Sequence, residues 1–171
     1  MSEITKPSKN EQFVKFIIDI TQKDNGCAAA LKRADNPATE YQSWEYLARF
    51  IDIEKDYERL PYATVASAMA KAKVEQNGAV KIGEALARCY EDGNKNDQAK
   101  AKLRRLLACE TVEEACRVLR PLFSLIGSKA GIQLDYISLL QDLRNFHFNN
   151  QRVKSQWAQN FYRHYSIEEN A

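Results

Sequence analysis

The stretch TVEEACRVLRPLFSLI, residues 111–126, decides the fold class of this chain. Thr111 and Glu114 have the spacing of a capping box, in which two side chains satisfy backbone N–H groups at a helix start. Apolar side chains then recur at helical spacing, at Val118, Leu119, Leu122, Phe123 and Ile126. The stretch therefore predicts an amphipathic helix. Because Pro121 has no backbone N–H, we expect it to kink or split that helix.

The segments on either side of this stretch repeat the helical pattern. Ser8 and Glu11 form another capping box, before a helix expected to end near Lys23. Asp135 has the position of a first-turn acid or N-cap before another apolar helical pattern. The remaining expected helices lie at about 28–33, 44–51, 82–89, 100–107 and 153–161, and one runs from Pro61 to about Lys73.

The composition supports a helical protein. Only six of the 171 residues are glycine, which leaves little material for the tight turns of a many-stranded sheet protein. No stretch shows the strict alternation of apolar and polar residues that a half-buried strand requires. We therefore predict an all-α fold of about eight helices in two packed helical lobes.

The polar run EDGNKN, residues 91–96, is the best candidate for a boundary inside the chain. It divides the chain into a predicted N-terminal helical lobe, 1–92, and a predicted C-terminal helical lobe, 93–171, with a basic surface. The formal net charge is only +2, but residues 1–78 hold 11 basic and 12 acidic residues, whereas residues 95–165 hold 12 and 6. The second part is thus suited to a polyanion, or carries a solvated basic face with counterions.

The sequence lacks the residue patterns that several classes of function require. No apolar run is long enough for a membrane span, and no glycine-rich loop is present to bind nucleotide phosphates. His147 and His164 have no neighbour at metal-ligand spacing, so we expect no metal and no other cofactor. The four cysteines show no CxxC spacing, which favours reduced thiols in a cytoplasm. The sequence therefore favours a binding protein over an enzyme.

Five segments, taken in order, resemble one known family. They are AALKRA at 29–34, IGEALAR at 82–88, AKLRRLLA at 101–108, LDYISLLQDL at 134–143 and WAQNFY at 157–162. Each segment is short, but together they cover most of the chain. The sequence resembles CasB, the small subunit of the type I-E CRISPR surveillance complex Cascade.

The resemblance implies a non-catalytic protein of the prokaryotic cytoplasm that functions in antiviral defence. It implies an all-helical subunit, present in two copies, whose basic surface binds nucleic-acid backbone and stabilises the R-loop and the displaced strand. The implied partners are the guide RNA, the target DNA, other Cascade subunits and a second copy of the chain. Pairing with the guide RNA would supply sequence recognition. Because the RNA–DNA duplex is about as stable as the DNA duplex that it replaces, a few phosphate contacts can shift the equilibrium toward the R-loop.

The expected nucleic-acid-binding residues are cations on helices or helix ends. The resemblance places the family's basic positions on Arg33, Lys81, Arg88, Lys102, Arg105, Arg120 and Arg152. Neighbouring cations complete the expected set, namely Lys32, Arg104 and Lys154. Lys32 stands where the family usually has arginine, and Pro121 follows Arg120 where a second arginine is common, so the basic surface is expected to differ in shape. The acidic stretch 52–58 has no counterpart in the family.

Two other functions are compatible with the residues alone. An all-α adaptor could bind acidic proteins with the same basic face. An enzyme using Cys109 or Cys116 as a nucleophile would need a thiol with a lowered pKa. Four aromatic side chains at helical spacing are expected in the core rather than stacked on bases: Trp44, Trp157, Phe161 and Tyr162.

Overall fold

The computed structural model describes the backbone of residues 5–168 and the side chains of residues 5–163. Within these residues the chain is all-α, as predicted, with nine α-helices and two short 3₁₀ helices. In chain order they are α1 (Lys9–Lys23), α2 (Asn25–Lys32), η1 (Glu40–Ser43), α3 (Trp44–Leu47), α4 (Asp56–Ala72), α5 (Ile82–Arg88), η2 (Gly93–Lys95), α6 (Asp97–Leu107), α7 (Val112–Gly127), α8 (Tyr136–Phe146) and α9 (Asn150–Glu168).

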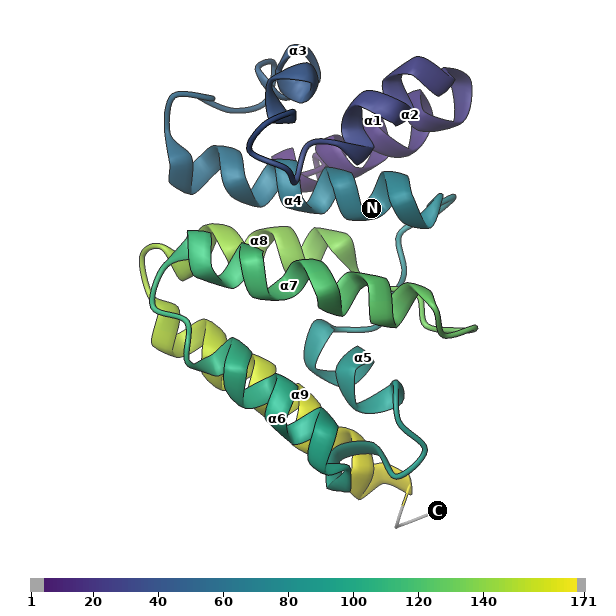
Figure 1. Cartoon of the computed structure of the whole chain (residues 1–171), viewed down its shortest axis with the longest axis vertical. Coiled ribbons are helices and arrows are strands. Elements are labelled where there is room, and N and C mark those ends of the chain that lie inside the picture. Colours follow the sequence, from purple (N-terminus) through teal and green to yellow (C-terminus); the bar gives the residue numbers. More distant parts are fainter. Residues whose placement is uncertain (1–4, 169–171) are drawn as a thin grey trace.

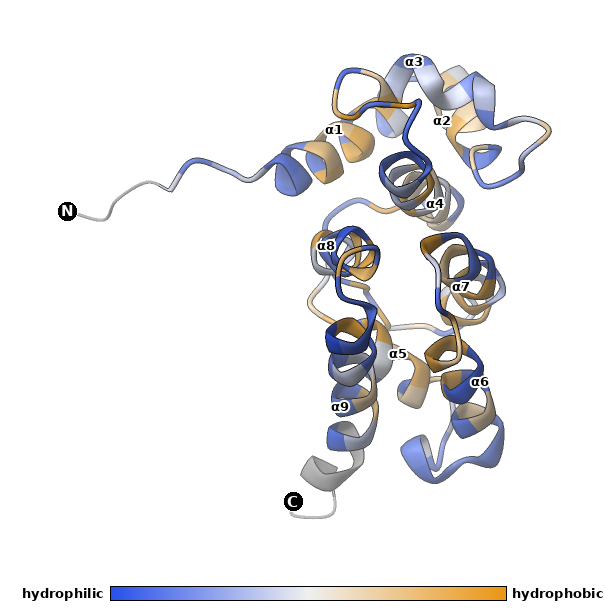
Figure 2. Cartoon of the chain, turned by 90° about the vertical axis from the view of Figure 1, so that its left-hand side faces the viewer, coloured by the Kyte–Doolittle hydropathy of each residue, from blue (hydrophilic) through white to orange (hydrophobic). Residues whose placement is uncertain are grey.

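The helices are arranged in tiers along the long axis of the molecule (Figure 1). Helices α1, α2 and α3 form one end, and α4 lies beneath them. Helices α7 and α8 cross the middle and contact α4, while α5, α6 and α9 form the other end. Apolar residues gather on the inward faces of these helices (Figure 2), as expected of amphipathic helices around a core.

The predicted caps form at the helix starts. The Ser8 and Thr111 hydroxyls each accept a hydrogen bond, 3.2 Å long, from the backbone N–H three residues on. The Asp135 carboxylate accepts a similar bond of 3.0 Å from the N–H of Ser138. These bonds satisfy N–H groups that have no partner inside the helix, so they fix where α1, α7 and α8 begin.

Both prolines expected to mark helix boundaries lie inside helices. Helix α4 begins at Asp56, five residues before Pro61, so the prediction that Pro61 opens this helix is wrong. The carboxylates of Asp56 and Glu58 occupy the first turn, where the helix dipole stabilises them. Helix α7 is not split at Pro121, because buried residues on both sides hold it against the core.

The core confirms most of the aromatic predictions. Trp157 and Phe161 are fully buried, and Trp44 packs against the core while partly exposed. Tyr162 is 46% exposed, so the prediction that it lies in the core is wrong. The reason is helical geometry: one residue beyond Phe161 lies about 100° further round the helix.

The predicted division into residues 1–92 and 93–171 stays a prediction, and many contacts cross it. Helix α4 packs against α7 and α8, and α5 packs against α9. The polar run 91–96 is itself anchored, because the Asn94 amide donates to the backbone oxygen of Tyr162 over 2.6 Å. Buried residues from both segments belong to one hydrophobic cluster.

Backbone contacts hold the lower tier to the rest. The N–H of Val80 donates to the oxygen of Gln133 over 3.1 Å, and the N–H of Asp135 donates back to Val80 over 2.9 Å. Further along, Gly83 lies so close to α9 that a Cβ at this position would collide with the backbone oxygen of Trp157. The absence of a side chain at Gly83 therefore allows α5 and α9 to approach each other.

We predict that Gly83→Ala lowers the free energy of unfolding by about 1–3 kcal/mol, because the backbone of α9 must move to admit the methyl group. Urea unfolding followed by circular dichroism measures this. Gly127→Ala is the control, since nothing lies within 4 Å of the added Cβ there. In α7 the alanine should leave stability unchanged or raise it by up to about 1 kcal/mol. Equal effects of the two substitutions would contradict the close approach.

Candidate nucleic-acid interface

Helix α6 carries the densest group of predicted nucleic-acid-binding residues. The Asn96 side chain caps it by accepting a 3.0 Å hydrogen bond from the N–H of Ala99. The helix buries Ala99, Leu103 and Leu106 against the core. The buried stripe takes one side, and the three predicted cations lie outside it: Arg104 and Arg105 are exposed, and Lys102 is half-buried, as is the fourth cation of the helix, Lys100.

These three cations have no acidic partner. Among the described residues, neither Lys102, Arg104 nor Arg105 takes part in an ion pair. The two arginines also lie in the last turn, where the partial negative charge of the helix end favours them. Helix α6 thus presents positive charge to solvent that no acidic side chain of residues 5–163 pairs with.

The two cations on α9 differ in their surroundings. Arg152 is exposed near the start of the helix. Lys154 is only 8% exposed, with its ammonium 3.1 Å from the Glu110 carboxylate and 5.9 Å from the centre of the Phe146 ring. Its charge is already compensated, so Arg152 is the better placed of the two to meet a phosphate.

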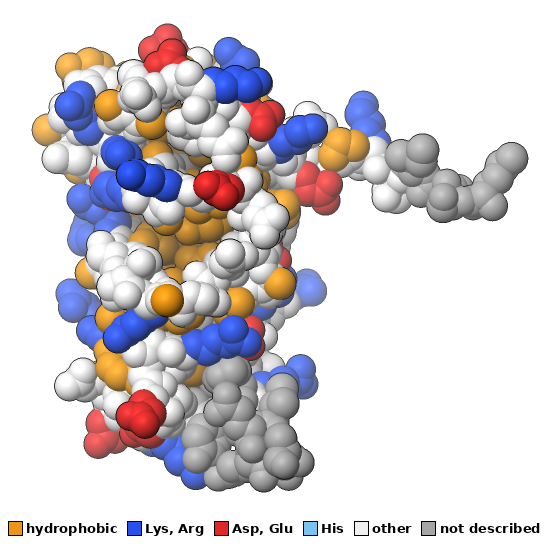
Figure 3. Space-filling model, turned by 90° about the vertical axis from the view of Figure 1, so that its right-hand side faces the viewer, with side chains coloured by type: hydrophobic (Ala, Val, Ile, Leu, Met, Phe, Trp, Pro, Cys, Tyr) orange, Lys and Arg blue, Asp and Glu red, His pale blue; other side chains and the backbone are white. Residues whose placement is uncertain are grey.

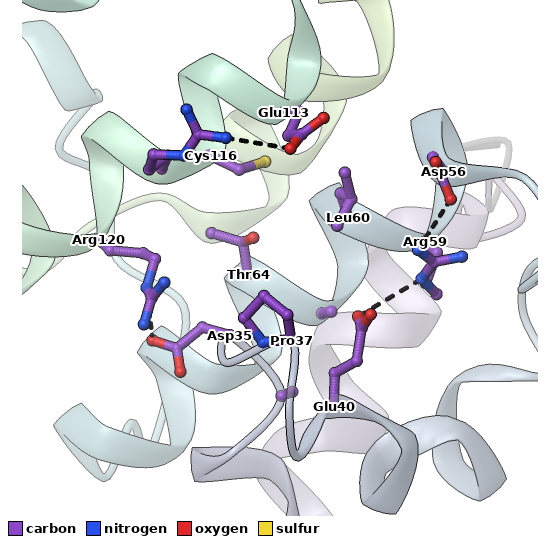
Figure 4. Close-up of a pocket in the computed structure, with 13 residues that line it drawn as sticks. Asp35, Pro37, Glu40, Asp56, Arg59, Leu60, Thr64, Glu113, Cys116 and Arg120 are labelled. Carbon is purple, nitrogen blue, oxygen red and sulfur yellow. Dashed lines mark hydrogen bonds and ion pairs between the residues drawn. The ribbon is translucent and has the colours of Figure 1, made fainter.

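Arg120 belongs to a cluster built from three elements. Its Nε lies 3.4 Å from the Asp35 carboxylate, toward which it points in Figure 4, and the Lys71 ammonium lies 2.6 Å from the same oxygen. A hollow of about 360 Å³ beside them is also lined by Arg117. Two cations share one carboxylate, so the cluster keeps a positive excess. Lys71 was not predicted, because no local pattern links it to Asp35, 36 residues earlier.

The other predicted residues lie on α2 and α5 or directly beside these helices. Lys32 and Arg33 are at the end of α2, where the Arg33 guanidinium donates to the Gln42 amide oxygen over 3.1 Å. On α5 and its cap, Arg88 pairs with Glu84 and Lys81 with Asp135, each at 2.9 Å. The ten predicted residues therefore do not form one patch: α6 and Arg152 offer free cations, and Lys81, Arg88, Arg120 and Lys154 are paired.

The cavity drawn in Figure 4 lies between α4, α7 and the loop before η1 and has a volume of about 250 Å³. Its charged groups neutralise one another. Arg59 lies 2.8 Å from Asp56 and 3.4 Å from Glu40, and Arg117 pairs with Glu113 at 3.0 Å. This mutual pairing makes the cavity a poor phosphate site.

The two cysteines considered as nucleophiles, Cys109 and Cys116, are buried. Burial raises the pKa of Cys116 to about 12 and also raises the pKa of Cys109. A nucleophilic thiol needs the opposite shift. The ring of His147 stacks on Tyr57, with 4.2 Å between ring centres. Neither thiol has the lowered pKa that the cysteine-enzyme alternative predicts.

The expectations about metal sites and membrane spans can be compared with the described residues. Residues 5–163 contain no group of three or more His, Cys, Asp or Glu side chains placed to hold a metal ion. The side chain of His164 lies outside the described residues. No helix in the described part of the chain combines the length and the apolar character that crossing a membrane requires.

Lys and Arg side chains are spread over the face shown in Figure 3, around an apolar hollow. A hollow of about 380 Å³ between α4, α7 and the segment before α8 is lined by apolar side chains such as Phe123 and Ile132, together with Lys71 and Arg120. The positive charge of the molecule is thus distributed over several helices.

Comparison with known proteins gives a family match. The family model of CRISPR-associated protein Cse2 matches residues 28–162. Among curated proteins, no sequence matches the chain.

Solved structures share the fold. The crystal structure of M. ruber CasB superposes with a TM-score of 0.79 at 24% identity, covering 96% of this chain and 98% of that one. A chain of a CRISPR RNA-guided surveillance complex matches with a TM-score of 0.77 at 20% identity, covering 95% and 96%. A Cse2-family protein from Thermus thermophilus matches with a TM-score of 0.76 at 18% identity, covering 91% and 99%.

The ionisation of one partly buried acid, Asp142, is expected to make stability depend on pH. Burial raises the pKa of Asp142 to about 6, against a hydrogen bond from the Trp157 indole that lowers it. The folded protein therefore binds more protons than the unfolded chain between about pH 4 and pH 6. Stability should fall as pH rises through that window, by up to about 3 kcal/mol.

Asp142→Asn keeps an acceptor for Trp157 but removes the ionisation. We expect the variant to be more stable than the parent at pH 8, by up to about 3 kcal/mol, and equal to it near pH 4. Asp135→Asn is the contrasting control. Burial pushes the pKa of Asp135 up, but hydrogen bonds from Asn77 and Lys81 outweigh burial and hold it below its ordinary value. That variant should lose stability at neutral pH. Urea unfolding across this pH range tests both, and an unchanged profile for Asp142→Asn would contradict the assignment.

Proposed function

The chain belongs to the CRISPR-associated Cse2 family, also named CasB, and we propose that it is the non-catalytic small subunit of a type I-E Cascade ribonucleoprotein. In that role it binds the backbone of nucleic acid, stabilises the R-loop between guide RNA and target DNA, and holds the displaced strand during antiviral defence. Its partners are the guide RNA, the target DNA, other Cascade subunits and a second copy of itself, in the prokaryotic cytoplasm.

The uncompensated positive charge on α6 is the observation that carries this proposal. Lys102, Arg104 and Arg105 face outward without acidic partners among the described residues. Neutralising phosphates with such cations releases counterions and gives affinity that does not depend on sequence. A subunit with this property is useful where guide pairing already supplies recognition.

The paired cations have a smaller expected part in binding. Lys81, Arg88 and Lys154 each lie within 3.1 Å of a carboxylate. A phosphate would have to compete with that carboxylate for the same donor. We therefore rank Lys102, Arg104, Arg105 and Arg152 first. Lys32 and Arg33 come second, together with Arg120, which shares its carboxylate with Lys71. Lys81, Arg88 and Lys154, each paired with a carboxylate, come last.

We predict that Lys102→Glu with Arg105→Glu weakens binding of the assembled complex to target DNA. The dependence of log affinity on log salt should become less steep, by about 0.7 for each lost single-strand phosphate contact. Fluorescence anisotropy with labelled target at several salt concentrations measures both changes.

A matched control separates local contact from net charge. Lys15→Glu with Lys23→Glu makes the same change in net charge on exposed positions of α1. This control should keep the parent's salt dependence. If the α6 variant and the control behave alike, the proposed role of α6 is wrong.

The adaptor alternative predicts a different result for the isolated chain. We expect the chain to bind labelled single-stranded and duplex DNA with an affinity that falls steeply between two salt concentrations. An adaptor that uses its basic face for acidic proteins would show no such binding. Titration of both DNA forms, and copurification with a tagged backbone subunit and guide RNA, distinguishes the two functions.

A further inference from the structure

The described residues that line a groove between α8 and α9 all have polar side chains. The groove has a volume of about 480 Å³, and α9 runs from the end of α8 along one edge of the molecule (Figure 2). The lining residues are Lys81, Ser138, Gln141, Asp142, Asn145, Gln156, Gln159, Asn160 and Arg163. Of these, only Lys81 belongs to the expected basic set, so the charge pattern of the sequence does not point to this groove.

The lining forms two matching helical stripes. Helix α8 contributes Ser138, Gln141, Asp142 and Asn145, and α9 contributes Gln156, Gln159, Asn160 and Arg163. Each stripe has the spacing i, i+3, i+4, i+7, so its members share one helix face over about 10 Å. The apolar stripes of the same helices pack in the core, with Leu143 and Trp157 fully buried. Both helices thus turn a second, polar face toward the groove.

Several carboxamides in the groove are available for a ligand. Gln141 is used, because it accepts from Asn10 over 2.9 Å and donates to Asn145 over 3.1 Å. In residues 5–163, the side chains of Gln156, Gln159 and Asn160 have no hydrogen-bond partner. Each of these amides offers two donors and one acceptor oxygen.

The charge of the groove is close to balanced. Lys81 and Arg163 are its cations, and Asp142 is the one carboxylate in its lining. Lys81 is already paired with Asp135. Binding here must therefore depend mainly on neutral hydrogen bonds. Among the described residues, no apolar or aromatic anchor lines the groove, although such anchors dominate the energy of protein interfaces. Asn, Gln and Ser are, by contrast, common ligands of the phosphates and sugars of nucleic acids.

We propose that this groove binds a short single-stranded stretch of nucleic acid, with Arg163 on a phosphate and the carboxamides of Gln156, Gln159 and Asn160 on phosphate and sugar oxygens. The inference rests on the proposed function and deepens it. It adds a site of neutral contacts to the charged surface of α6.

Neutral and charged contacts differ in how they respond to salt. A carboxamide contact releases no counterion, so its loss lowers affinity equally at all salt concentrations. We expect Gln156→Ala with Gln159→Ala to weaken binding of labelled single-stranded DNA by about threefold to tenfold, with an unchanged salt slope. Arg163→Gln should instead reduce the slope by about 0.7. The measurement is fluorescence anisotropy on the full chain and on the assembled complex.

The control for the double variant is Gln151→Ala, which removes an exposed carboxamide from the same helix outside the groove. It should bind as the parent does, and circular dichroism should show that all variants keep their helices. Asp142→Asn removes the carboxylate from the lining and should tighten binding at pH 8.

Three results would overturn the inference: parental affinity of the double variant in both the chain and the complex, an equal loss in Gln151→Ala, or a loss of assembly with partner subunits while nucleic-acid binding persists. The last result would make the groove a protein interface. Failure of the proposed function is seen separately, as an unchanged salt slope in the α6 variant.

Discussion

The structure depends on the burial of α4 by helices from both ends of the chain. Its residues 61–70 are all buried, and α1, α2, α7 and α8 all contact it. Four of these ten residues are alanine, so neighbouring helices can approach closely. Polar groups on α4 are satisfied across the contacts: the Tyr62 hydroxyl donates to Asn10 over 2.8 Å, and the Ser67 hydroxyl donates to the Lys32 oxygen over 2.9 Å. Helices α1, α2, α7 and α8 are positioned by this packing, and α5, α6 and α9 pack in turn on α7, on α8 and on one another.

The same packing sorts the cations of the chain into two classes. Where helices meet, a cation finds a carboxylate from another element, as Lys154 finds Glu110 and Lys71 finds Asp35. On α6 the outer face meets no other helix of the described chain, so Lys102 and its neighbours stay unpaired. A basic residue is therefore available to a phosphate where its helix face meets no other helix that supplies a carboxylate. The polar groove between α8 and α9 arises in a similar way, because its amide side chains lie on helix faces next to the apolar faces that pack in the core.

Sequence patterns predicted the local structure well where a local interaction decides it. The capping residues Ser8, Thr111 and Asp135 act on N–H groups within three positions, and each was identifiable from spacing alone. Pro61 was misjudged because a proline after the first turn is tolerated when the helix around it is buried. The burial of Lys154 could not be predicted from a local pattern either, because its partner Glu110 lies 44 residues away in the chain.

The sequence by itself determined the all-α fold, the helix caps, the inward leucines of α6 and the family. The reason is that apolar periodicity and capping hydrogen bonds depend on residues a few positions apart in the chain. The tertiary structure alone decided which cations remain free, which carboxylates are shared, and where polar stripes of α8 and α9 form a groove. These properties depend on contacts between residues far apart in the chain, as with Lys81 and Asp135, 54 positions apart. Charge can be counted along a sequence, but its compensation is a property of packing.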